Sequence, residues 1–402
     1  MANSVLPEEL MLCILTRLPV KTIIRFKSVC KPWYDLFSTS EFKKLHQAQF
    51  SSDPENQSYI VHSFDRHSSE PKNQFYIFNI ESPTILDHPF VHEQYIELYT
   101  VGCCNGLVCI SSGQEIVLWN PAMKLSKTVP LKDCRPFKIV SLGFGYDAIE
   151  DDFKVVMLVG NIVYGEGMNI TSVEIYSVNL GFWITVDVGF HFIWFPTKND
   201  LIVNGNPCWV AWLDDDNQVL VCFDVLELVL KILPLPDEEA GTEVDLDEET
   251  ETKTEVDLDE DTETKIWTEK EGNLTLFDWN GALGALSIDY EIECRVGPGA
   301  EFTRCCARIE CAEVWVFDDI EGIWRNDHSF GPIEVGVDSV IHCTKNEKVL
   351  GTLSFDTLFM LDLKTECVKE LFDSSACLGY SFEVYGYTES LANISGMQNW
   401  SN

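Results

Sequence analysis

The first residues of the chain carry apolar positions at helical spacing. Leu10, Ile14 and Leu18 recur four residues apart, the interval that places side chains on one face of an α-helix. Pro7 suits the first turn of this helix, and Pro19 is expected to end it. All six residues from 10 to 15 are apolar, so this helix needs cover on more than one face.

Three more short helices are predicted in the same region. One spans 21–29, the next opens at Pro32, and the last runs through EFKKLHQAQF with Ser40 as its N-cap. More than half of the positions from Val5 to Phe37 are apolar. A unit of about 45 residues has too small an interior to bury them all, so the remainder must face another part of the chain or another protein. These residues alone fit an N-terminal helical bundle and an interaction module equally well.

From about residue 96 the pattern changes to short apolar runs, often alternating, separated by Gly, Asn and Asp. Four segments share one plan: a turn, an apolar strand, a second strand that ends in an apolar residue and Asn or Asp, and a closing strand. The second strands end at Trp119-Asn120, Phe223-Asp224, Phe317-Asp318 and Leu361-Asp362. A fifth copy follows FGYD and lacks the opening Asn-Gly. Such repeats predict a mostly β chain with a small all-α N-terminal module and a β-propeller, with a β-sandwich as the alternative.

An acidic stretch interrupts the β region. TEVDLDEETETK at 242–253 is followed by TEVDLDEDTETK at 254–265, and the copies differ only at Glu249 and Asp261. Residues 237–265 hold 15 acidic and two basic side chains. Such a segment cannot bury enough apolar area to fold, so we predict a disordered acidic insert over 237–265.

The charge of the chain narrows the class of partner. The formal net charge of −37 argues against a nucleic-acid binder, which normally has a basic face. Residues 1–50 hold seven Lys or Arg against four Asp or Glu, a net charge of +3, which leaves −40 for residues 51–402. The start lacks the features of a signal peptide, and no apolar window of about 18 residues predicts a membrane span. We therefore expect a cytoplasmic protein, which could also occupy the nucleus, without membrane contact.

Neither the cysteines nor the clustered carboxylates predict a metal or catalytic site. Fifteen cysteines are scattered, and those in apolar runs, such as Cys109, Cys208 and Cys222, are expected to be reduced core thiols. No cysteine pair has the second Cys/His pair of a zinc site, so we predict no metal site. GFGYD at 143–147 is interpreted as a tight turn, and the carboxylate cluster that follows it as a polar hairpin tip. The cluster comprises Asp147, Glu150, Asp151 and Asp152.

Motifs for catalysis are missing as well. The sequence has no phosphate-binding loop, no H-E-x-x-H zinc motif and no G-x-S-x-G nucleophile elbow. We therefore predict no catalytic residue and no cofactor. A propeller hydrolase is an alternative that fold alone cannot support.

The N-terminal residues resemble a known module. LPEEL…ILTRLPVKTIIRFKSVCKPWYDL resembles the F-box, which docks on a Skp-type adaptor. The resemblance implies adaptor-binding residues at Leu6, Pro7, Leu10, Ile14, Leu15, Leu18, Pro19, Ile23, Arg25, Phe26, Val29, Cys30 and Trp33.

The rest of the chain resembles the plant F-box-associated, kelch-like domain. The shared motifs are CNGLVCI, LWNP, GFGYD…DDFKVV, VEIYSVNLGFW and VNGNPCW. The two resemblances imply an F-box at 1–48, a connecting segment with the first strands at 49–95, and a propeller at 96–392. Within this group the chain is also similar to the S-locus F-box proteins of self-incompatible plants, by general likeness rather than by one motif.

The resemblance implies a function for both parts. The chain would be the substrate-recognition subunit of a Skp–cullin–F-box ubiquitin ligase, a subunit without catalytic activity of its own. Its F-box would hold the adaptor and, through it, the cullin, while its propeller would hold a target for ubiquitination and proteasomal degradation. The acidic chain favours a basic target, and the S-locus likeness makes a non-self S-RNase the sharpest candidate. The alternative is an F-box protein that binds the adaptor without directing degradation.

Overall fold

The computed structural model describes most of the chain in two units. The described residues are 7–52, 58–65, 73–78, 83–90, 98–134, 137–163, 167–196, 201–214, 217–236, 265–279, 281–296, 302–333, 339–343, 348–353, 357–365, 367–373 and 380–400. Leu6 and the acidic insert predicted at 237–265, apart from Lys265, lie outside them. The first unit comprises Met1–Ile232 with Ser381–Asn402, and the second comprises Leu233–Tyr380.

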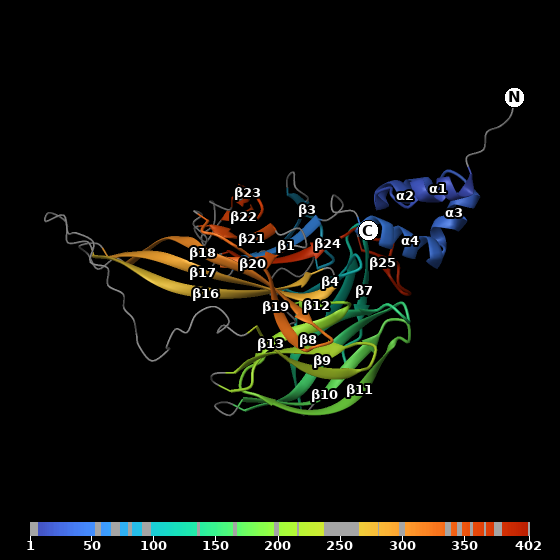
Figure 1. Cartoon of the computed structure of the whole chain (residues 1–402). Helices are drawn as coiled ribbons and strands as arrows, with labels where there is room; N and C mark the ends of the chain where they lie inside the picture. The colour runs from blue at the N-terminus through green and yellow to red at the C-terminus, as the bar shows by residue number, and fades with distance from the viewer. Residues whose placement is uncertain are drawn as a thin grey trace. The chain divides into compact units, whose positions relative to one another are not determined.

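Four short helices form the N-terminal part of the described chain (Figure 1). They are α1 (Glu8–Leu15), α2 (Val20–Phe26), α3 (Lys31–Ser38) and α4 (Ser40–Ser51). Prolines mark three of the starts: Pro7 is the N-cap residue of α1 and Pro32 lies in the first turn of α3, as predicted, while Pro19, expected to end the first helix, is the N-cap residue of α2. Each proline fixes φ where the helical N–H would have no intrahelical acceptor, so it costs no hydrogen bond.

Several helix boundaries differ from the prediction. Helix α1 ends at Leu15, before Leu18 and Pro19, because the amides of Arg17 and Leu18 bond to carbonyls three positions back. Helix α2 ends at Phe26, earlier than expected, because the next amides bond to carbonyls three positions back, as Val29 N does to Phe26 O at 3.0 Å. Thr39, and not Ser40, caps α4, and its hydroxyl accepts a hydrogen bond from Phe42 N at 3.2 Å. Ser40 is the first residue of the helix itself.

The rest of the described chain forms six antiparallel sheets. Four belong mainly to the first unit. Their orders are β24-β1-β2-β3, β25-β7-β6-β5-β4, β11-β10-β9-β8 and β12-β13-β14-β15. The strands of the first two are β1 (Ser58–Asp65), β2 (Asn73–Phe78), β3 (Thr84–Leu86), β24 (Tyr380–Tyr387), β4 (Tyr99–Cys104), β5 (Leu107–Ser111), β6 (Ile116–Asn120), β7 (Leu125–Val129) and β25 (Gln398–Asn399). Those of the other two are β8 (Lys138–Asp147), β9 (Asp152–Val163), β10 (Gly167–Ser177), β11 (Phe182–Phe192), β12 (Leu201–Val203), β13 (Asn206–Trp212), β14 (Gln218–Asp224) and β15 (Val229–Pro234).

The second unit holds two sheets of the same kind, with orders β16-β17-β18-β19 and β20-β21-β22-β23. Their strands are β16 (Lys265–Trp279), β17 (Ala282–Val296), β18 (Phe302–Asp318), β19 (Ile323–Phe330), β20 (Ser339–Cys343), β21 (Lys348–Leu353), β22 (Thr357–Asp362) and β23 (Cys367–Asp373). Four-stranded antiparallel meanders are the repeating unit of a β-propeller. The predicted fold class is therefore confirmed.

The residue pairs that mark the repeat in the sequence lie at strand ends and cap the following turns. Asp224 Oδ1 accepts hydrogen bonds from the amides of Leu226 at 3.0 Å and Glu227 at 2.9 Å. Asp318 and Asp362 accept in the same way from the amides two and three positions further on. Asparagine and aspartate are favoured in turns for this reason, so the repeat in the sequence reflects turn chemistry.

GFGYD lies inside strand β8, so the prediction of a tight turn at 143–147 is wrong. Its glycines permit a close approach instead. A Cβ at Gly145 would lie 2.4 Å from the Gly205 carbonyl oxygen, and one at Gly143 would lie 2.7 Å from the Trp209 ring. The glycines therefore let β8 pack against the hairpin formed by β12 and β13.

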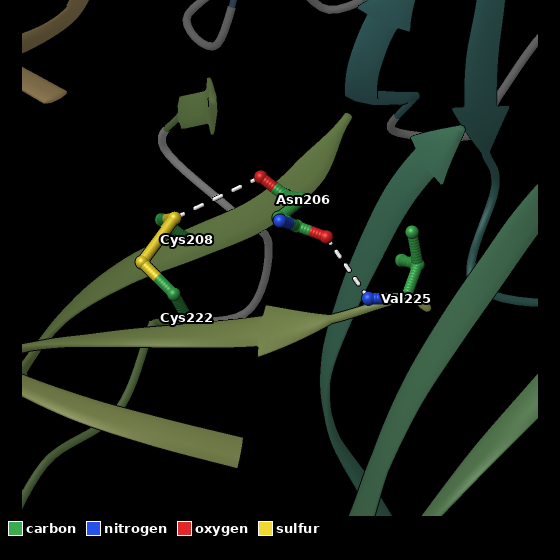
Figure 2. Close-up of a disulfide and its surroundings, with 4 residues drawn as sticks. All are labelled: Asn206, Cys208, Cys222 and Val225. Atoms are coloured by element: carbon green, nitrogen blue, oxygen red, sulfur yellow. Dashed lines mark hydrogen bonds between the residues drawn. A yellow bond between two sulfur atoms is a disulfide. The ribbon is translucent and has the colours of Figure 1, made fainter. Parts of the chain in front are cut away.

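Two of the cysteines expected to be reduced form a disulfide, which Figure 2 shows. Cys208 on β13 and Cys222 on β14 are direct partners in the antiparallel register, with Cα atoms 4.1 Å apart. The expectation of reduced thiols was wrong for this pair because it ignored cross-strand register, which brings residues that are separate in sequence face to face. Cys109 is a buried free cysteine, as expected, and burial raises the pKa of its thiol.

Candidate functional site

The helical region exposes large apolar side chains along α1 to α3. Leu10 and Ile14 are 54% and 53% exposed, and Val29 is 63% exposed. Ile24 and Tyr34 are exposed as well. Leu10 and Ile14 stand one turn apart on the same face of α1. Single exposed apolar residues are ordinary, but their concentration in so short a segment favours a protein-docking surface.

The adaptor-binding residues predicted from the sequence divide into three groups. Two, Leu15 and Ile23, are buried, with 4% and 0% exposure, and support the helices from inside. Three are partly buried: Leu18, Phe26 and Trp33. Seven are exposed: Pro7, Leu10, Ile14, Pro19, Arg25, Val29 and Cys30. In this conformation, only the seven exposed residues could contact a partner directly. That they bind the adaptor stays a prediction.

Aromatic side chains build the core beneath this surface. The Trp33 ring centroid lies 5.1 Å from that of Phe26 and 6.0 Å from that of Phe37, which in turn lies 4.9 Å from Phe42. Such tilted pairs add to the stabilisation from area burial. The same cluster contains Leu391, a residue from the opposite end of the chain.

A buried histidine ties the last helix of this region to the first loop. His46 on α4 is fully buried, and its Nε2 lies 2.8 Å from the Leu18 carbonyl oxygen. Burial lowers the pKa of the imidazole, so a neutral ring with Nε2–H donating to that carbonyl fits the site. The bond satisfies the carbonyl of a residue in the turn between α1 and α2.

The carboxylate cluster is a hairpin tip between β8 and β9, as predicted, and its charges are engaged in structural contacts. Asp147 Oδ2 receives a hydrogen bond from Lys154 Nζ at 2.7 Å. Asp152 Oδ2 accepts one from the Ser177 hydroxyl at 2.5 Å. Asp151 accepts one from the Tyr146 hydroxyl at 2.6 Å and forms an ion pair with Lys44 of α4 at 3.0 Å.

The pKa values of this cluster fit the structural role. For Asp147 and Asp151, burial acts to raise the carboxyl pKa, but hydrogen bonds and a lysine ammonium outweigh it and lower both. A general acid needs the opposite shift. Among the described residues, no group of three or more His, Cys, Asp or Glu side chains could hold a metal ion. No helix in the described ranges is long and apolar enough to span a membrane.

Comparison with known families identifies both parts of the chain. Residues 4–45 match the F-box domain, and residues 72–296 match the F-box associated β-propeller domain. The chain belongs to the F-box associated β-propeller family. The recognition made from the sequence is thereby confirmed for both domains. The boundaries predicted at residues 48 and 95, and the narrower likeness to S-locus F-box proteins, stay predictions.

The relatives of this F-box protein include several from Arabidopsis thaliana. One is the Putative F-box protein At3g16210, 26% identical over 245 residues that cover 58% of this chain and 61% of the relative. Another is the F-box/kelch-repeat protein At3g23880, 28% identical over 245 residues that cover 58% of this chain and 65% of the relative. The chain thus spans about three fifths of the length of these curated relatives.

Sequence reasoning missed the residues that hold the F-box on the rest of the chain. Leu391 packs in the core of the F-box. Asn120 bonds to Met123 in the turn between β6 and β7, and Glu389 lies near Val20 at the start of α2. Asn120 appeared in the sequence only as a repeat marker. No local pattern could pair Leu391 with helices at the opposite end of the chain, because only the fold brings them together.

Proposed function

We propose that this protein is the substrate-recognition subunit of a Skp–cullin–F-box ubiquitin ligase. The F-box helices bind a Skp-type adaptor and, through it, the cullin. The propeller domain binds a target protein, which is ubiquitinated and degraded by the proteasome in the cytoplasm or the nucleus. The subunit performs no bond chemistry and contributes proximity, because it raises the effective concentration of target lysines near the conjugating enzyme.

The observation that carries this proposal is the F-box match together with the exposed apolar residues on the helices it covers. Leu10, Ile14 and Val29 are each more than half exposed in the free chain. Burying such side chains against a partner removes apolar area from water, at roughly 25 cal/mol per Å². Central apolar anchors of this type typically dominate the binding free energy of an interface.

Adaptor binding by a double variant tests the proposal. Changing both Leu10 and Ile14 to Asp would place two carboxylates in a desolvated interface, at a cost of several kcal/mol, so affinity should fall by about 100-fold or more. Ile149→Asp and Ile320→Asp are matched controls, because both residues are exposed isoleucines at propeller turns. Undiminished affinity of the double variant, or a wild type that binds no adaptor, would refute the assignment.

The target is proposed to be a basic protein, and a non-self S-RNase is the sharpest candidate. The net charge of −40 on residues 51–402 should attract a basic partner and repel acidic ones. Affinity capture with the proteasome blocked would supply the target. Its association rate should then fall markedly between about 0.05 and 0.3 M salt, as the Debye length shrinks from roughly 14 to 6 Å. A captured target of acidic pI, or a rate indifferent to salt, would refute the electrostatic argument.

The degradative role needs its own measurement. If the captured target is degraded through this ligase, its half-life should lengthen when the proteasome is inhibited and when Leu10 and Ile14 are changed to Asp. A half-life that neither treatment changes would favour the alternative, an F-box protein that binds adaptor and target without directing degradation.

A further inference from the structure

The core of the F-box is completed by residues from the far end of the chain. We call residues 388–400 the C-terminal strap. Leu391 of the strap is 1% exposed and belongs to the same cluster as Leu15, Val20 and Phe42 of the helices. Met123, from the turn between β6 and β7, packs against this cluster too. In Figure 1 helix α4 lies beside β25.

A buried asparagine holds the strap and this turn together. Asn120, at the end of β6, is fully buried, and its Nδ2 donates to the carbonyls of Ser390 at 3.0 Å and Ala392 at 2.8 Å. Its Oδ1 accepts a hydrogen bond from Met123 N at 3.1 Å. One side chain therefore fixes both segments that reach the F-box core, and buried groups satisfied in this way specify a single arrangement.

Backbone packing also fixes the path of the strap. Gly106 has φ +76°, and a Cβ there would lie 2.1 Å from the Ser390 Cβ, so the turn at 105–106 fits the strap without a side chain. Beyond it, β25 pairs with β7, with Gln398 opposite Ser126. The strap is thus anchored to the second sheet on both sides of Leu391.

The strap also brings a carboxylate close to the start of helix α2. Helix α2 begins after Pro19, which has no side-chain acceptor for the first helical amides. Burial raises the pKa of the Glu389 carboxyl, while the nearby Val20 amide and Lys21 ammonium act to lower it. A carboxylate at this end of a helix also interacts favourably with the helix dipole. The strap therefore contributes a polar contact as well as an apolar one.

We propose that the C-terminal strap is a positioning element that completes the F-box core and fixes the orientation of the F-box on the second sheet. Leu391 fills the apolar core of the F-box, and the hydrogen bonds of Asn120 hold the strap to the β6–β7 turn. The inference rests on the proposed function, because a fixed orientation matters when one part of the chain binds the adaptor and another the target. A unit of about 45 residues is marginally stable by itself, so residues 7–52 need the strap to keep one arrangement. A fixed F-box then holds the lysines of a bound target at a defined distance and orientation from the conjugating enzyme.

Hydrogen exchange of the full chain tests the strap directly. Leu391→Ala should speed amide exchange in α2 and α4 by about tenfold or more, while exchange in β9 and β10 stays as in the wild type. Leu391→Met, which keeps the volume, should restore the protection. Leu363→Ala is the matched control, because Leu363 is buried to a similar degree in a core cluster of the second unit and should leave α2 and α4 unchanged.

Orientation is tested by X-ray scattering from the complex with the adaptor. The wild-type complex should give one compact distance distribution, and Leu391→Ala should broaden it and weaken adaptor binding several-fold. Asn120→Ala should act in the same direction, because it removes the hydrogen bonds to the carbonyls of Ser390 and Ala392. This variant keeps the test open if Leu391→Ala fails to fold.

The outcomes separate this inference from the proposed function. Wild-type exchange in α2 and α4 of Leu391→Ala, or scattering that does not broaden, would overturn the role of the strap even if the wild type binds adaptor tightly. A wild type that binds no adaptor would overturn the proposed function, while the exchange comparison would still decide whether the strap completes the F-box core.

Discussion

A buried ion pair between Lys154 and Asp147 is expected to stabilise the β8–β9 hairpin. The two side chains are 7% and 2% exposed, and Nζ lies 2.7 Å from Oδ2. Lys154 Nζ also donates to the Val225 carbonyl at 2.9 Å, and Asp147 Oδ1 accepts from the amides of Ile149 and Glu150, both at 2.9 Å. Lys154 Nζ also lies 3.7 Å from the exposed Glu150 carboxylate, so Asp147 is its closer and better buried partner.

Removing one partner should cost far more than removing both. Lys154→Met leaves a buried carboxylate without its cation, and Asp147→Asn leaves a buried ammonium whose remaining anion is the exposed Glu150 carboxylate at 3.7 Å. Each should destabilise by about 3–5 kcal/mol, with Asp147→Asn at the lower end. The double variant buries no charge, and the amide oxygen introduced by Asp147→Asn can still accept from the two turn amides. Its main loss is the donor to the Val225 carbonyl, about 1–2 kcal/mol. The expected coupling between the sites is at least about 2 kcal/mol.

Native-state hydrogen exchange at β8 and β9 is the suitable assay, because it reports local opening even if the two units unfold separately. Each single variant should speed exchange by about 100-fold or more, since about 1.4 kcal/mol corresponds to a factor of ten. The double variant should lie within about 30-fold of the wild type. If the two single effects simply add in the double variant, the ion-pair argument is refuted.

Three further predictions test other contacts. The pKa of Asp147 is lowered in the folded protein, so its carboxylate stabilises the fold above the unfolded pKa of about 3.9, and this stabilisation is lost as pH falls through the folded pKa. In acid unfolding, the wild type should therefore lose stability over this pH range, whereas Asp147→Asn should lack that part of the loss. Gly145→Ala should lower the melting temperature because its Cβ would meet a carbonyl oxygen at 2.4 Å, whereas Gly189→Ala, with nothing within 4 Å, should not. Trp183→Phe removes the hydrogen bond from Nε1 to the Pro130 carbonyl at 2.7 Å and should cost about 1 kcal/mol in urea unfolding, and an unchanged midpoint would contradict it.

The elements that the sequence predicts well are those with local physical causes. Pro7 and Pro32 mark helix starts because proline lacks an N–H and fixes φ. Asp224 and Asp362 mark strand ends because each carboxylate accepts the amides of the turn that follows. Such signals involve residues within three positions of one another, so they can be read along the chain.

The features that sequence reasoning missed depend on contacts between distant segments. The glycines of GFGYD look like turn residues, but Gly145 lies against the carbonyl of Gly205, which belongs to another sheet's hairpin. The Cys208–Cys222 disulfide follows from the register of β13 against β14. Strand β24 pairs with β1, so one sheet combines strands from near the two ends of the chain. No repeat motif in the sequence predicts this pairing.

The same distinction explains the apolar run from 10 to 15 at the start of the chain. Met11, Leu12 and Leu15 pack in the core that Leu391 completes, while Leu10 and Ile14 are half exposed. The run therefore serves two faces of α1, one covered by the chain itself and one free for a partner. A helix that packed only on its own chain would be expected to carry polar residues at the exposed positions. Substitutions on the two faces should consequently separate two effects: changes at Leu10 and Ile14 should weaken adaptor binding without altering helix exchange, whereas a change at Leu391 should alter both.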